Sequence, residues 1–131
     1  MNVGIVCEYN PFHLGHQKQI DSIREKFGAN TGIICAMSGN YVQRGTPAFM
    51  DKFSRTNIAL SNGADVVLEF PLCYAMSSAA YFATGAINIL NSLDSIDYLC
   101  FGCETDDINL LNIISDIIIN EDDTYSSTIQ S

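Results

Sequence analysis

The sequence predicts an α/β fold in which helices cover both faces of a parallel sheet. Short apolar runs rich in β-branched residues alternate with segments of helical periodicity, and this alternation is typical of parallel sheets. The chain has 131 residues, of which 47% are hydrophobic, which suits one domain with a core. Three Pro and nine Gly exclude collagen-like and low-complexity sequence.

The first strand and the first helix have the clearest signals. Residues 2–7 form a short, nearly continuous apolar run, which is typical of a buried strand. Residues 14–27 place apolar side chains at helical spacing between charged ones, at Ile20, Ile23 and Phe27. Gly28 follows as a stop signal, so we expect the helix to end there.

A long loop separates the second strand from the second helix. Residues 31–37 predict the strand, and 38–49, with two Gly and one Pro, predict the loop. Asp51 can cap a helix that runs to about residue 62 and that Gly63 ends. Loops of this length at strand ends are more often functional than plain connections.

The second half repeats the alternation. Residues 64–70 predict the third strand, closed by Pro71, and 97–101 predict the fourth. Residues 77–93 lie between them and are apolar on most sides. We therefore expect a well-buried helix there.

The end of the chain predicts a helix and a polar tail. The helix is expected over about 107–119, with Thr105 or Asp106 as its cap. Residues 120–131 are polar and form the tail. We therefore expect one domain over 1–119, without internal repeats or a linker.

This order of elements predicts where a ligand binds. Parallel strands joined by right-handed crossovers bring their carboxyl ends to one edge of the sheet. Ligands bind outside that edge, where the strand order reverses. The loops after Cys7 and after Phe101 are therefore the first places to look for a site.

Charge is unevenly spread along the chain, whose net charge is −9. Residues 1–55 hold all six basic residues and four acidic ones, while 56–131 hold eleven acidic residues and no basic one. Such a chain cannot grip a nucleic-acid backbone over a wide surface. An anion site is expected in the first 55 residues or on backbone N–H groups.

The cysteines and the hydropathy favour a cytoplasmic protein. The chain has five cysteines, Cys7, Cys35, Cys73, Cys100 and Cys103. Most of them lie in apolar runs, which suits buried reduced thiols. The last two form a CxxC pair with no second pair, so metal binding and redox chemistry are disfavoured. No apolar run reaches the ~18–20 residues of a membrane span, and no secretory signal is expected.

Two histidines stand directly after the first strand. His13 and His16 share one face of the first turn of the predicted helix, where unpaired N–H groups favour a phosphate. Gly15 between them lets a ligand approach the backbone. Two imidazole donors there can stabilise charge that develops during phosphoryl-group displacement. The alternative is a pair of structural histidines that cap a loop.

The string His13-Leu-Gly-His16 after a first strand resembles the HxGH signature of the nucleotidyltransferase superfamily. The resemblance implies a Rossmann-like, three-layer α/β/α fold with strand order 3-2-1-4, the superfamily's fifth strand being expected to be missing. It also implies cleavage of ATP, with Mg²⁺, between the α- and β-phosphates. The two histidines would be the catalytic residues, without a covalent enzyme intermediate.

Longer strings are similar to those of bacterial tRNA(Met) cytidine acetate ligases. They are GIVCEYNPFHLGHQKQI (4–20), MSGNYVQRGTPAFMDKFSRTNIALSNGADVVLEFP (37–71), SSAAYFATGAINIL (77–90) and LCFGCE (99–104). This family converts ATP and acetate to acetyl-adenylate and pyrophosphate. It then transfers the acetyl group to N4 of the wobble cytidine of elongator tRNA(Met).

The same resemblance implies a set of ATP-binding residues. They are Cys7, Glu8, Tyr9, Asn10, Pro11, Phe12, His13, Leu14, Gly15, His16, Gln17, Lys18, Gln19 and Ile20, together with Gly102. In the expected strand order the first and fourth strands are neighbours, so Gly102 would face the histidine loop. Instead of making room for the nucleotide, Gly102 could be a simple turn glycine. Instead of reaching a phosphate, Lys18 could simply be exposed to solvent.

A second basic cluster follows the second strand. Lys52 and Arg55 share a helix face and could clamp phosphates, or form a solvated face that pairs with Asp51. Further contacts to phosphate or substrate are expected in the preceding loop, at Ser38, Gly39, Gln43 and Arg44. Glu69, at the end of the third strand, could organise loop backbone or a basic side chain.

The chain lacks features that the full-length family has. A later Ser/Thr-rich motif ending in Arg is not matched, and the Ser126–Ile129 string that faintly echoes it is interpreted as chance. We therefore expect an N-terminal catalytic portion, with the tRNA-binding surface in the missing part. Two other functions stay open: another adenylyltransferase that acts on a phosphorylated small molecule, and a non-catalytic nucleotide-binding module.

Overall fold

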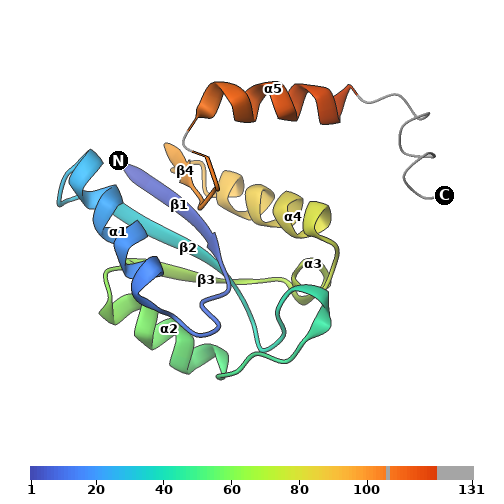
Figure 1. The fold of residues 1–131 in the computed structure, drawn as a ribbon. Helices are drawn as coiled ribbons and strands as arrows, with labels where there is room; N and C mark the ends of the chain where they lie inside the picture. The colour runs from blue at the N-terminus through green and yellow to red at the C-terminus, as the bar shows by residue number, and fades with distance from the viewer. Residues whose placement is uncertain (106, 121–131) are drawn as a thin grey trace. The chain divides into compact units, whose positions relative to one another are not determined.

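A computed structural model describes residues 1–105 and 107–120. Its central element is a parallel four-stranded sheet in the order β3-β2-β1-β4 (Figure 1). The strands are β1 (Asn2–Cys7), β2 (Gly32–Ser38), β3 (Val66–Phe70) and β4 (Tyr98–Cys100). This order confirms the predicted fold class, and β1 pairs with both β2 and β4.

The helices follow the predicted segments closely. They are α1 (Leu14–Phe27), α2 (Lys52–Ser61), α3 (Leu72–Ala75), α4 (Ala79–Ser92) and α5 (Ile108–Ile119), with a short 3-10 helix, η1 (Gln43–Gly45), after β2. Gly28 and Gly63 adopt φ values of 103° and 105°, which confirms them as helix stops. The Asp51 carboxylate caps α2 by accepting from two backbone N–H groups.

Each face of the sheet has its own core. Helices α1 and α2 cover one face, where Ile20 and Ala59 pack among alternate strand residues. Helix α4 covers the other face, where Leu90 packs against Ile34 and Ala36. Because both faces are covered, the strands are fixed, and each fully buried Ile contributes about 1.5–3 kcal/mol. The loops at the carboxyl edge therefore start from a rigid base.

Two features of the α4 region differ from the prediction. The sequence does not predict α3, because one turn after Pro71 is too short to show a helical period. The expectation that the helix over 77–93 is well buried is wrong. Tyr81 and Ile87 are 65% and 42% exposed, because the helix contacts the sheet through one side only.

The chain divides into two compact units, Met1–Phe101 and Gly102–Ser131, where the sequence suggested one domain to residue 119. In the second unit, α5 begins at Ile108 and its N-cap is Asp107, whose carboxylate accepts from two N–H groups, so Thr105 is wrong as the predicted cap. The other predicted cap, Asp106, lies outside the described residues. So do residues 121–131 of the predicted tail, including the Ser126–Ile129 string.

The cysteines are free thiols, and they differ in burial. Cys35 is buried and Cys7 and Cys100 are half-buried, but Cys73 and Cys103 are exposed, so the prediction of burial is wrong for those two. Within residues 1–105 and 107–120, no helix has both the length and the apolar character to cross a membrane.

Candidate active site

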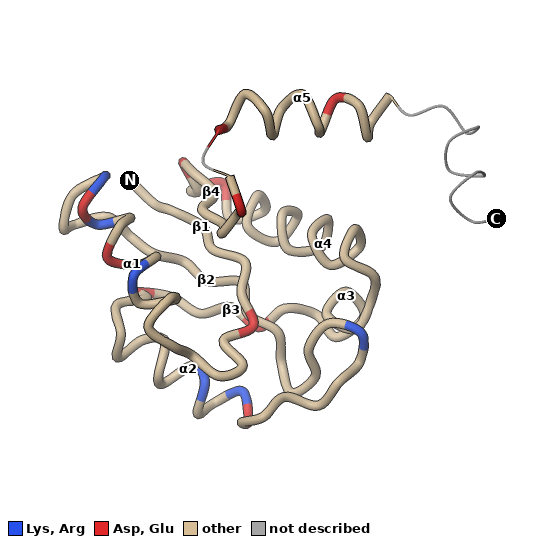
Figure 2. The backbone as a smooth tube through the Cα atoms, viewed as in Figure 1, with Lys and Arg blue, Asp and Glu red and all other residues tan. Residues whose placement is uncertain are grey.

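The basic residues lie on three elements of the fold, α1, η1 and α2. Figure 2 shows Lys and Arg on α1, on α2 and in η1, and none on β3, α3, α4 or β4. Two of these elements, α2 and η1, lie in or directly after the long loop that follows β2, and α1 begins after β1. Arg44, Lys52 and Arg55 therefore lie beside the loops at the carboxyl end of β2. Arg24 and Lys26, in contrast, lie in the last turn of α1, toward the other edge of the sheet.

His13 and His16 close the start of α1 by bonding to its backbone. His13 is the N-cap, and its Nδ1 accepts from the N–H of Gly15 at 3.1 Å. Nδ1 of His16 accepts from the N–H of His13 at 3.2 Å. The two rings stack with centroids 3.7 Å apart and an angle of 21° between their planes. The result is a capping box made of two imidazoles.

These bonds determine which nitrogen of each ring can act on a ligand. Because both Nδ1 atoms accept, each neutral ring carries its proton on Nε2. Burial, and then the charge of the neighbouring His13, lower the pKa of His16 below its ordinary value. Near pH 7, His16 is therefore a neutral donor with its Nε2–H on the side away from the helix start.

Gly15 makes room for the cap. A Cβ at this position would lie 2.9 Å from Cε1 and 3.1 Å from Nδ1 of His13. Contacts this short would displace the ring. The glycine therefore serves the geometry of His13, in addition to the predicted approach of a ligand.

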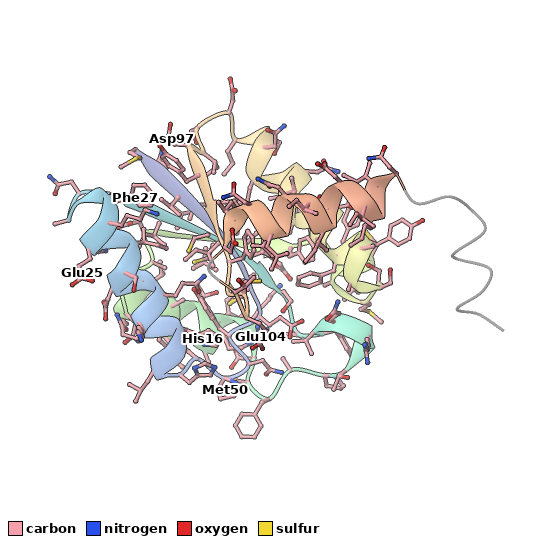
Figure 3. All side chains as sticks on the ribbon, turned by 45° about the horizontal axis from the view of Figure 1, so that its top comes forward. His16, Glu25, Phe27, Met50, Asp97 and Glu104 are labelled. Atoms are coloured by element: carbon pink, nitrogen blue, oxygen red, sulfur yellow. The ribbon has the colours of Figure 1, made fainter. Side chains whose placement is uncertain are left out.

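Two aromatic residues pack against His16, which is labelled in Figure 3. The ring centroids of Tyr9 and Phe12 lie 4.8 and 5.5 Å from that of His16. Tyr9 is 1% exposed, has a φ of 47°, and its hydroxyl lies 3.5 Å from Sγ of Cys35. Burial raises the pKa of Tyr9, so the phenol stays protonated. The predicted segment after β1 therefore includes a buried support for the imidazoles.

Side chains of the histidine loop bind the backbone of the long loop. Oε1 of Glu8 accepts from the N–H of Gln43 at 2.7 Å, and Oδ1 of Asn10 accepts from the N–H of Phe49 at 2.6 Å. The structure thus joins Glu8 to Gln43, and it joins Asn10 to the same long loop at Phe49. Sequence reasoning missed Asn40, whose Oδ1 accepts from the N–H of Lys52 at 2.9 Å. Its position in a loop before a helix was the available signal.

Arg55 is fully buried beneath these loops. Its Nη1 donates to the carbonyl of Glu8 at 2.6 Å, its Nε donates to Met50 at 3.1 Å, and its Nη2 donates to the carbonyl of Gly39. Burial lowers the pKa of Arg55, and nearby acidic groups oppose that shift. A phosphate contact would require the guanidinium to leave these carbonyls, so this contact stays a prediction.

Lys52 pairs with Glu69. Its ammonium lies 2.8 and 2.7 Å from the two carboxylate oxygens of Glu69. The alternative pairing of this helix face with Asp51 is wrong, because Asp51 caps α2 instead. The prediction that Glu69 organises a basic side chain is confirmed, while a phosphate contact of Lys52 stays a prediction.

A cavity of about 210 Å³ lies between α2 and the ends of β2 and β3. The hydroxyl of Ser38 is buried and, among the described residues, has no hydrogen-bond partner. The residues around the cavity are Met37, Ser38, Lys52, Phe53, Thr56, Val67 and Glu69. Ser38 was predicted as a pocket residue, and its ligand stays a prediction.

The other predicted residues have different surroundings. Lys18 and Arg44 are exposed, and Arg44 has a φ of 66°. Nε2 of Gln17 donates to the carbonyl of Asn62, and that of Gln19 donates to the carbonyl of Cys100, so both join α1 to its neighbours.

Three further residues complete the implied ATP set within the first unit. Pro11 and Leu14 are exposed, and Ile20 lies in the core. Gly102 is the first residue of the second unit, so its place in the site stays a prediction.

Known proteins resemble the chain along its whole length. The model of a family described as HIGH Nucleotidyl Transferase matches residues 1–131. The tRNA(Met) cytidine acetate ligase of Acetivibrio thermocellus is 47% identical over 125 residues, 95% of this chain and 30% of that protein. The enzyme of the same name from Clostridium perfringens is 52% identical over 122 residues, 92% of this chain and 30% of that protein.

Solved structures agree with the sequence matches. Thermotoga maritima TmcAL bound with alpha-thio ATP is 42% identical, with a TM-score of 0.85, over 96% of this chain and 30% of that one. The apo form of that protein gives a TM-score of 0.86. This chain therefore spans about 30% of the length of the relatives that it matches. With a family match over every residue and the paired imidazoles at the start of α1, the chain belongs to the HIGH nucleotidyltransferase family.

Proposed function

We propose that this chain is the ATP-binding, acetate-activating part of a tRNA(Met) cytidine acetate ligase. The observation that carries the proposal is the stacked pair of imidazoles whose Nδ1 atoms are used internally. No hydrogen bond in the described part of the chain uses either Nε2. Relatives of that name at 47% and 52% identity support the proposal, as does the likeness to TmcAL bound with an ATP analogue.

The imidazoles act as extensions of the helix start. A backbone N–H donates to Nδ1 on one side of each ring, and Nε2–H donates on the other side, so each ring carries the polarity of the helix terminus outward. Two such donors at the α- and β-phosphates stabilise the charge that develops on the leaving pyrophosphate. The exposed cations Lys18 and Arg44 are available for the outer phosphates.

The proposed reaction has two steps. An oxygen of acetate attacks the α-phosphorus, the bond to the bridging oxygen breaks, and pyrophosphate leaves. N4 of the wobble cytidine then attacks the acetyl carbon and loses a proton, and AMP leaves. Mg²⁺ would be held mostly by phosphate oxygens and water. Recognition of elongator tRNA(Met) belongs to the part of the relatives that this chain does not span, since this chain has only six basic residues and they are scattered over α1, α2 and η1 (Figure 2).

Exchange of labelled pyrophosphate into ATP tests the proposal, measured with acetate on the natural gene product that contains this chain. His13→Ala and His16→Ala should each lower the exchange rate by about 10²–10⁴-fold, because each removes one donor to the developing charge. Glu25→Gln is the matched control. Its side chain is exposed at the far end of α1 (Figure 3), and the rate should not change.

The outcomes separate the candidate functions. Exchange that requires a phosphorylated small molecule in place of acetate identifies another adenylyltransferase. ATP binding in calorimetry without exchange in any mixture identifies a nucleotide-binding module. Acetate-dependent exchange that neither histidine variant lowers would falsify the assigned roles of the imidazoles.

A further inference from the structure

Arg55 is a buried cation bonded only to backbone carbonyls. It lies one turn into α2, has no exposed surface, and binds Glu8 after β1, Gly39 after β2 and Met50 before α2. Neither of the two ion pairs in the described part of the chain includes it. Burying a charge without an ion-pair partner is costly. We therefore expect the hydrogen bonds of Arg55 to have a role that a buried hydrophobic side chain could not fill.

We propose that Arg55 is a positioning residue of the nucleotide site, which holds the segment from Glu8 to His13 in the geometry that aims the two imidazoles. The kinetic consequence of this inference rests on the proposed function. Its structural part, the fixing of residues 8–16, does not.

The path from Arg55 to the imidazoles is short. The carbonyl of Glu8 accepts from Nη1 at 2.6 Å, and the next residue is Tyr9. Tyr9 is buried with a positive φ, a conformation that surrounding contacts must hold in place. Its ring lies 4.8 Å from that of His16. A displaced Glu8 carbonyl therefore moves Tyr9, and Tyr9 moves the ring that must meet the phosphate.

Other bonds join the same loops, but they do not replace Arg55. Glu8 and Asn10 bind the N–H groups of Gln43 and Phe49 through their side chains. Within residues 1–105 and 107–120, only Arg55 donates to a carbonyl directly after each of the neighbouring strands β1 and β2. The guanidinium presents its donors in a fixed plane, whereas a lysine ammonium is a compact charge on a flexible stem. Arg55→Lys therefore keeps the charge and loses the arrangement of the bonds.

Arg24 is a matched control within the same chain. It donates to the carbonyls of Ala29 at 2.7 Å and Gly63 at 2.8 Å, and it pairs with Asp65 at 3.2 Å. These partners lie before β2 and β3, at the opposite edge of the sheet from the histidines. Arg24 thus has the same kind of carbonyl bonds without a connection to the site.

Three variants of the natural gene product test the inference: Arg55→Lys, Arg55→Ala and Arg24→Ala. Arg55→Lys should lower kcat of pyrophosphate exchange by at least about tenfold, with KM for ATP changed less than about threefold, because misplaced groups cost rate before affinity. Arg55→Ala should lose more, and millimolar guanidinium should restore part of its rate. Arg24→Ala should lower the melting temperature and leave kcat unchanged.

Hydrogen exchange without ATP provides the structural readout. Amides of residues 8–16 should exchange faster in Arg55→Lys than in the wild type, and Arg24→Ala should leave them unchanged. Folded Arg55→Lys with wild-type kcat, or with unchanged protection of residues 8–16, overturns the inference. So does a fall in kcat of Arg24→Ala equal to that of Arg55→Ala and equally restored by guanidinium, which would indicate general stabilisation. If Arg55→Ala does not fold, Arg55→Lys decides. If the wild type shows no exchange of pyrophosphate into ATP, the proposed function fails. Amide protection of residues 8–16 still tests the positioning role in that case.

Discussion

The two edges of the sheet are each held by an arginine, but the arginines differ in their charge environment. At the edge where the strands begin, Arg24 binds two carbonyls and is balanced by Asp65, and both side chains are partly exposed. At the edge where they end, Arg55 binds three carbonyls and is fully buried without an ion pair. At the first edge, the charge of Arg24 is balanced by a partner within the chain. The second also carries imidazole donors that the described residues do not use.

This difference shows how one fold separates stability from ligand binding. Loops at the amino edge need only bind one another, so a charge-balanced arrangement suits them. Loops at the carboxyl edge of a parallel sheet receive the ligand, so groups there must be fixed while their outer atoms stay available. Arg55 and the capping box of His13 and His16 meet both requirements. Substitutions at the carboxyl edge should therefore lower the reaction rate, and substitutions at the amino edge should lower the stability.

The largest effect is expected from Gly15→Ala at the carboxyl edge. The new Cβ would displace the His13 ring, so the pyrophosphate-exchange rate should fall by about 10- to 100-fold. Stability should not fall in parallel, since Ala favours a helix by about 1 kcal/mol over Gly. Ser22→Ala, on the exposed middle of α1, is the control for an added helix former. A wild-type rate in Gly15→Ala would show that the ring position does not matter.

A smaller effect, on stability alone, is expected from Asp65→Ala at the amino edge. Asp65 accepts from the N–H of Ile33 at 2.8 Å and from Arg24 at 3.2 Å. Its removal should lower the free energy of unfolding by about 1–3 kcal/mol, measured with denaturant. Glu25→Ala, exposed on α1, should have little effect. A fall in kcat of the folded Asp65→Ala protein would mean that the two edges are coupled.

The smallest effect is the pH dependence contributed by His16. Its pKa is lower in the folded chain than its ordinary value of about 6.5, so the unfolded chain binds this proton more readily. The stability contributed by the neutral ring is therefore complete above about pH 6.5 and is lost as the pH falls through the lowered pKa. Denaturant unfolding near neutral and at mildly acidic pH should show a steeper loss for the wild type than for His16→Gln. Identical slopes would contradict the lowered pKa.

The fold was largely predictable because its signals are local. Each strand is a short apolar run, Gly28 and Gly63 end helices with positive φ, and Asp51 caps α2 from the adjacent position. The burial of α4 was not predictable, because an apolar composition does not reveal how many sides a sheet will cover. The cap of α5 was missed by one or two residues, which is usual where several acidic or hydroxyl residues stand together.

The site was predictable where its residues are adjacent in sequence and not where they are distant. His13, Gly15 and His16 share one turn, and their spacing alone indicates a common face. Arg55 reaches carbonyls up to 47 residues away, and backbone carbonyls have no sequence signature. Lys52 pairs with Glu69 across 17 residues, through a strand alignment that only the folded sheet provides. Distant partners of these kinds require coordinates.

The chain contains two histidines in its 131 residues, and both belong to the stacked pair at the start of α1. Every imidazole signal from these 131 residues, whether a nitrogen resonance or the mass added by an acylating reagent, therefore reports on this one place. Since each Nδ1 is engaged, such a reagent meets only the outward nitrogen, and a bound nucleotide would shield it. Footprinting of histidine alone thus measures occupancy in unlabelled protein, without a mutation.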